Sequence, residues 1–150
     1  MKQTDQRTAA KPSLRAVQEW PRWVIYVCLS AIFVQASVWQ VAGALVKLGR
    51  DGFLIFGVEA SMVIGAMPAF TMGIVAGLYQ LLILTVLVLV AFRRKRAMAV
   101  LLAAVALHLV IWVRVSFNPY VPAWPGLIIF TAEMVSVFML NTLAIRTPVR

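Results

Sequence analysis

The sequence contains one cysteine, one histidine and only five acidic residues among its 150 residues. With Cys28 alone, the chain cannot form an intrachain disulfide, and it has no CxxC or Cys/His metal pattern. The single histidine, His108, excludes bis-histidine haem ligation within one chain, and one His with one Glu is a poor metal site. No Ser/His/Asp or Cys/His set and no nucleotide or phosphate motif is present. We therefore expect no catalytic residues, no metal and no cofactor, which favours a non-enzymatic protein.

Apolar residues are in excess. They make up 63% of the chain, and the mean hydropathy is +0.92, whereas soluble domains are about half apolar. The net charge of +9 would suggest nucleic-acid binding in a soluble protein. Here the basic residues flank long uncharged runs, so membrane topology and anionic lipids explain them better. The expected partner is the lipid bilayer and not a nucleic acid.

Four apolar runs are long enough to be membrane spans, at residues 23–46, 71–92, 97–117 and 126–145. Each has about 20 residues or more, which as a helix crosses the roughly 30 Å of bilayer hydrocarbon. A basic tail, 1–22, precedes them and a short tail, 146–150, follows. The sequence therefore predicts an all-α integral membrane protein with four transmembrane helices.

The distribution of basic residues predicts the orientation. With both termini in the cytoplasm, eleven of the fourteen lysines and arginines lie on the cytoplasmic side, including the run Arg93–Arg96. Lys47 and Arg50 fall outside, and Arg114 lies within a span. This bias follows the positive-inside rule. It favours a multi-pass protein of a bacterial-type inner membrane.

A further apolar segment, 53–70, lies between the first two spans and contains Glu59. If it crossed the membrane, the run Arg93–Arg96 would move to the outside, and the turn near 67–72 would have no polar residue. We expect it to lie on the membrane or to re-enter it from the outer side. The predicted form is a short helix over 53–67 that breaks at Pro68.

Small residues recur every four positions through this segment and into the next span, a spacing that lets another helix approach closely. The alternative is chance in a region rich in Gly and Ala. If the stripe is real, it packs on another helix of this chain or of a partner. Its members are Gly57, Ser61, Gly65, Ala69, Gly73 and Gly77.

Five polar side chains fall at similar depth in the outer half of the predicted bundle, namely Gln40, Gln80, His108, Arg114 and Glu133. Polar groups in a bilayer are costly and usually have a partner or a function. The sequence leaves open whether Glu133 pairs with Arg114 or with His108. It also leaves open whether this layer fixes helix packing, faces another subunit, or forms a site for a polar ligand, a quinone head group or a proton.

Two functions follow. The first is a non-catalytic accessory or structural subunit of a larger membrane complex, bound to another membrane protein or to copies of itself. Its small size, few intramembrane polar groups and apolar outer segment favour this function. The alternative is a small carrier or a quinone- or redox-associated protein that uses the outer-half polar layer.

Overall fold

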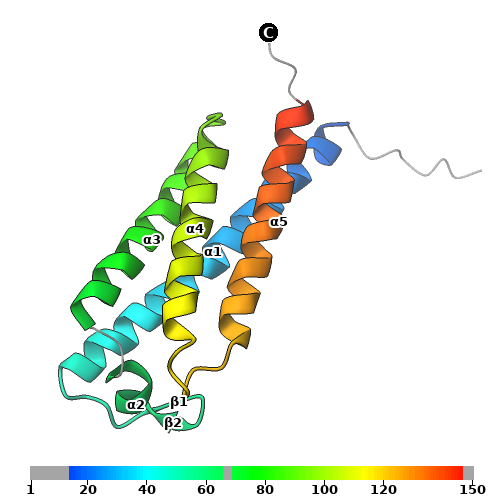
Figure 1. Cartoon of the computed structure of the whole chain (residues 1–150). Coiled ribbons are helices and arrows are strands. Elements are labelled where there is room, and N and C mark those ends of the chain that lie inside the picture. The colour runs from blue at the N-terminus through cyan, green and yellow to red at the C-terminus, as the bar shows by residue number, and fades with distance from the viewer. Residues whose placement is uncertain (1–13, 66–68, 147–150) are drawn as a thin grey trace, which may run out of the picture.

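Four long helices dominate the computed structural model, which describes residues 14–65 and 69–146. They are α1 (Leu14–Lys47), α3 (Ala69–Ala91), α4 (Ala97–Val115) and α5 (Trp124–Arg146) (Figure 1). Each contains a stretch long and apolar enough to cross a membrane. The expected class, a mostly helical multi-pass membrane protein with four spans, agrees with this structure.

The four helices pack side by side in a ring, in the order α1, α3, α4, α5 and back to α1. The described ends of the chain, at the start of α1 and the end of α5, lie at the same end of the bundle (Figure 1). Helix α1 continues through Pro21 and so begins earlier than the predicted span. Short connections between α3 and α4 and between α4 and α5 make these pairs antiparallel neighbours.

The core lies along one stripe of each helix. In α1 the fully buried residues Ile25, Leu29 and Ile32 recur at the spacing of one helical face. They pack with buried residues of the neighbouring helices, including Ile83, Val86, Leu101 and Ala104. Large apolar side chains on the other faces are exposed, as expected for surfaces that contact lipid.

The helix predicted over 53–67 was wrong in its first half. Strands β1 (Leu54–Ile55) and β2 (Val58–Glu59) pair as an antiparallel hairpin, and only α2 (Ala60–Gly65) is helical. The two loop residues, Phe56 and Gly57, have φ angles of 54° and 80°. Positive φ at both positions is the requirement of a tight type I′ hairpin turn, which glycine meets readily. The predicted break at Pro68 lies outside the described residues.

Aromatic and polar contacts fix the hairpin against the bundle. The Phe56 ring lies 5.9 Å from that of Trp39 and 5.6 Å from that of Trp124. These contacts hold a phenylalanine in a backbone conformation that such residues rarely adopt. The buried Asn118, between α4 and α5, donates a 2.8 Å hydrogen bond to the carbonyl of Val63 in α2. The hairpin and α2 therefore cover this end of the bundle, which we call the hairpin end.

The hairpin divides the predicted small-residue stripe. Gly57 lies in the hairpin turn and cannot share a helical face with the other members. Ser61 belongs to α2, whereas Gly73 and Gly77 belong to α3. A Cβ atom built on Gly77 would have no atom within 4 Å. The residues that the structure describes therefore supply no close helix contact at Gly77.

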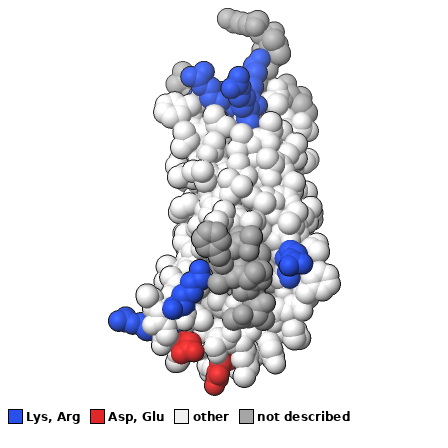
Figure 2. Space-filling model, turned by 60° about the vertical axis from the view of Figure 1, so that its left-hand side comes forward, with Lys and Arg blue, Asp and Glu red and all other residues white. Residues whose placement is uncertain are grey.

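Most exposed charged side chains lie toward the two ends of the molecule. Figure 2 shows basic residues gathered at one end, acidic and basic residues at the other, and a wide, almost uncharged band between them. Arg93–Arg96 follow α3 at the end opposite the hairpin, whereas Asp51 and Glu59 lie at the hairpin end. The uncharged band is the surface that the membrane hydrocarbon would cover.

Helices α4 and α5 meet closely at Trp112 and Gly126. A Cβ atom added to Gly126 would overlap the Trp112 indole, which shows that the two residues are in close contact. We predict that Gly126→Leu lowers the free energy of unfolding by about 1–3 kcal/mol, since overpacking forces the two helices apart. Gly77→Leu is the matched control, because space is open there. Thermal unfolding in detergent, followed by circular dichroism, measures both. Equal melting temperatures for the two variants would contradict this packing.

Candidate functional site

A fully buried carboxylate joins three of the long helices. Glu133 of α5 accepts a 2.7 Å hydrogen bond from the Tyr79 hydroxyl of α3 through Oε1. Its Oε2 lies 2.8 Å from Nδ1 of His108 on α4, and His108 is also buried. We call Tyr79, His108 and Glu133 the carboxylate cluster. It answers the question that the sequence left open: Glu133 pairs with His108.

Helix registers explain why these side chains meet. Tyr79 lies ten residues into α3, Glu133 nine residues into α5, and His108 seven residues before the end of α4. At 1.5 Å per residue, all three lie about 10–15 Å from the hairpin end of their helices. Antiparallel packing of α4 on its two neighbours then brings them to one level.

The cluster satisfies both oxygens of a group that hydrocarbon would otherwise disfavour. An unpaired carboxylate at the centre of a spanning helix costs a few kcal/mol. Hydrogen bonds to a charged acceptor offset about 1.5–3 kcal/mol each. The cluster thus stabilises the bundle and keeps a group that can exchange protons inside it. Among the described residues, no three His, Cys, Asp or Glu side chains lie close enough to hold a metal ion.

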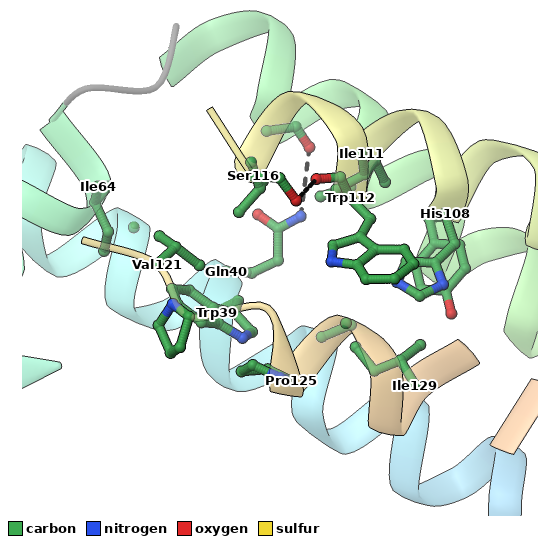
Figure 3. A pocket seen from close by; sticks show the side chains of 18 of the residues that line it. Trp39, Gln40, Ile64, His108, Ile111, Trp112, Ser116, Val121, Pro125 and Ile129 are labelled. Atoms are coloured by element: carbon green, nitrogen blue, oxygen red, sulfur yellow. Dashed lines mark hydrogen bonds between the residues drawn. The ribbon is translucent and has the colours of Figure 1, made fainter. Parts of the chain in front are cut away.

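A cavity of about 310 Å³ lies beside the cluster, in the hairpin-end half of the bundle (Figure 3). Its size falls at the lower end of the range of small-molecule sites. Tyr79 and His108 form part of its wall, and most of the remaining wall is apolar or aromatic. Main contributors are Ala36, Trp39, Ala76, Ile111, Trp112 and Ile129. Lys47 lines it at the end of α1.

Trp112 lies next to His108 of the carboxylate cluster and forms part of the cavity wall. Its ring lies nearly parallel to that of His108, at 21° and 6.5 Å between centroids, as their four-residue spacing on one helical face predicts. On its other side it stacks on Phe130. The indole Nε1 is buried and has no hydrogen-bond partner among the described residues. Such an unpaired donor is unusual in a packed interior.

The structure separates the five residues of the predicted polar layer. His108 and Glu133 meet directly. Gln40 lines the same cavity and makes a long 3.4 Å contact with the carbonyl of Gly73. Gln80 instead donates a 2.9 Å hydrogen bond to Ser37, which ties α3 to α1 away from the cavity. Arg114 is exposed on α4, and neither described hydrogen bond of Glu133 involves it.

Reasoning from sequence missed two contributors to the site, Tyr79 and Trp112, and one hydrogen-bond partner outside it, Ser37. Tyr79 directly precedes Gln80, and a tyrosine hydroxyl within a span needs a partner, which was the available signal. Trp112 follows His108 by four residues, but no sequence pattern shows that its N–H lacks an acceptor. No sequence pattern singles out Ser37 of α1. Only the packing of α1 on α3 reveals it as the acceptor for Gln80.

Comparison with known proteins identifies no relative: no protein family, curated protein or solved structure matches the chain. The fold and the site define its class by themselves. It has four helices long and apolar enough to span a membrane, with a buried carboxylate cluster beside an apolar cavity.

We predict that Glu133→Ala lowers the free energy of unfolding by about 2–5 kcal/mol, because it leaves the buried Tyr79 hydroxyl and His108 Nδ1 unpaired. Glu133→Gln should lower the free energy of unfolding by less, because an amide can still accept a hydrogen bond from Tyr79 and donate one to His108. Thermal unfolding in detergent measures both.

Glu59→Ala is the control for this prediction, because Glu59 is exposed at the end of β2. Its effect should stay within about 0.5 kcal/mol. If Glu133→Ala were as mild as this control, the cluster would not stabilise the bundle.

Proposed function

We propose that this chain binds a small lipid-soluble molecule in the cavity beside the carboxylate cluster, as a small carrier or a quinone- or redox-associated membrane protein. One observation carries the proposal. A mainly apolar cavity of about 310 Å³ has two polar side chains of a buried, hydrogen-bonded cluster in its wall. This combination, an apolar body with a few placed polar groups, is typical of small-molecule sites.

Position supports the same proposal. The cavity is lined by residues of all four long helices and of the hairpin end, including Ile64 and Val121. It lies between helices that are long and apolar enough to span a membrane, where lipid-soluble molecules concentrate. A structural role alone would need the hydrogen bonds of the cluster but no cavity beside them, since interiors are normally close-packed.

The accessory-subunit function remains a second proposal, and a different observation favours it. Large apolar side chains stay exposed beyond the ends of the spanning helices, near the hairpin end: Leu48 at 74%, Leu54 at 68% and Phe117 at 77%. Apolar surface outside the hydrocarbon suits a protein partner or a second copy. Purification of the tagged protein from native membranes in mild detergent, with mass spectrometry of retained proteins, tests it. A stoichiometric partner that Leu54→Ser and Phe117→Ser release would support it.

For topology, we propose that both termini face the cytoplasm of a bacterial-type inner membrane and that the hairpin and α2 lie at its outer face. The cluster of four basic residues after α3 supports this orientation. The described apolar residues 54–65 then rest in the outer interface, with Ile64 in the cavity wall.

The cavity predicts a substitution that blocks binding. Ala76→Leu places a larger side chain in the cavity wall. We therefore expect the amount of co-purifying small molecule per protein to be at least about fivefold lower than for the wild-type protein. Mass spectrometry of solvent extracts from purified protein measures it. Ala106→Leu is the matched control, because Ala106 is exposed on α4 and does not line the cavity. Equal extracts from both variants, or no molecule above the level of empty membranes, would count against the proposal.

The proposed topology is tested with single cysteines in a Cys28→Ala background. We expect a membrane-impermeant maleimide to label Asp51→Cys on intact spheroplasts, because Asp51 is exposed at the hairpin end. Lys95→Cys, exposed at the opposite end, should react only after the membrane is opened. The reverse pattern would show that the chain has the opposite orientation.

A further inference from the structure

We infer that His108 presents its Nε2–H group to the cavity as a hydrogen-bond donor, and that the bound molecule carries a carbonyl oxygen that accepts from it. This inference rests on the proposed function, because it names the chemical class of the molecule that the cavity takes. It comes from the geometry of the cluster and from the number of protons that a buried pair can hold.

The first step concerns which atom of His108 remains available. Nδ1 lies 2.8 Å from Oε2 of Glu133, so this side of the ring is occupied. The ring has one other polar atom, Nε2, and His108 forms part of the cavity wall. In Figure 3 the His108 ring lies beside the Trp112 ring at the inner end of the cavity.

The second step concerns the protons. Glu133 is fully buried and His108 is 4% exposed, both in helices suited to span a membrane. A net charge there is disfavoured, so the pair as a whole is neutral. Because Oε1 already accepts from Tyr79, a neutral pair has two arrangements that leave no carboxyl proton unpaired. Either Glu133 is ionised and His108 carries two ring protons, or Glu133 holds a proton toward Nδ1 and the neutral ring carries its proton on Nε2. In both arrangements Nε2 bears a hydrogen.

The other polar and charged groups near the pair do not change the protonation of Nε2. The Tyr79 hydroxyl already donates to Glu133 and adds no proton to the histidine. Lys47 also lines the cavity, and its Nζ lies 4.0 Å from the position of a Cβ on Gly73. Gly73 is six residues from Tyr79, about 9 Å along α3, so this cation lies near the other end of the cavity. Arg114 is exposed on the bundle surface.

The cavity therefore offers a hydrogen-bond donor at its inner end, the Nε2–H group of His108. The Trp112 indole N–H also has no partner among the described residues, but its nitrogen is packed against Gly126 and does not face open space. Buried donors without acceptors are costly, and a carbonyl oxygen supplies an acceptor without a hydrogen of its own. The apolar wall accommodates the rest of the molecule. A lipid-soluble ketone or quinone meets both requirements, whereas a pure hydrocarbon meets only the second.

His108 is the only histidine in the sequence, so labelling with ¹⁵N-histidine reports on this residue alone. The wild-type protein is placed in lipid nanodiscs, and the ¹⁵N signals of Nδ1 and Nε2 are recorded. Two probes are compared: a decyl-substituted 1,4-benzoquinone, and decyl-p-xylene, in which methyl groups replace the carbonyl oxygens. Quenching of tryptophan fluorescence measures quinone binding, and displacement of the quinone measures hydrocarbon binding. The Ala76→Leu variant gives the background from probe in the lipid.

The expected result has two parts. Nε2 shows the signal of a protonated nitrogen in the free protein, and the quinone shifts this signal whereas the hydrocarbon does not. The quinone also binds about five- to tenfold more tightly than the hydrocarbon, as one hydrogen bond predicts. An unprotonated Nε2, or two probes that bind equally and leave Nε2 unchanged, would overturn the inference while leaving the proposed cavity function intact. Absence of saturable binding by either probe would refute both.

Discussion

The hydrogen bonds of Glu133 are the interaction on which the rest of this structure depends. A carboxylate with no exposed surface in a spanning helix is tolerated only if its oxygens are satisfied. Tyr79 and His108 do this from two other helices, so the registers of α3, α4 and α5 are fixed relative to one another. Apolar packing alone specifies register weakly in lipid, because hydrocarbon solvates each helix face about as well as a neighbouring helix does.

The cavity lies beside this cluster. Small residues such as Ala36, Gly43 and Ala76 in its wall leave space between the helices. The hairpin covers the hairpin end, where the Phe56 ring contacts those of Trp39 and Trp124. In the proposed site, stability and binding would therefore share residues. His108 contacts Glu133 through one ring nitrogen, and the proposed ligand would bind the other.

Prediction from sequence succeeded where composition decides the outcome. The apolar runs gave four helices of nearly the expected extent, because backbone groups in hydrocarbon must bond within their own helix. It failed at 53–59, where a hydrophobic run was taken for a helix and forms a hairpin. The strands there are only two residues each, too short for an alternating pattern to appear. Gly57 was the one local signal, and it was assigned to a helical stripe instead.

Part of the candidate site could also be predicted from the sequence, and part could not. By itself the sequence determined that His108 and Glu133 lie at similar depth on neighbouring helices, since depth follows from counting residues along a helix of fixed rise. It could not determine the rotation of each helix about its axis. That rotation buried His108 beside Glu133, left Arg114 on the surface, and turned Gln80 toward Ser37 and away from the cavity. Only the tertiary structure sets it, because the contacts that fix it come from other helices.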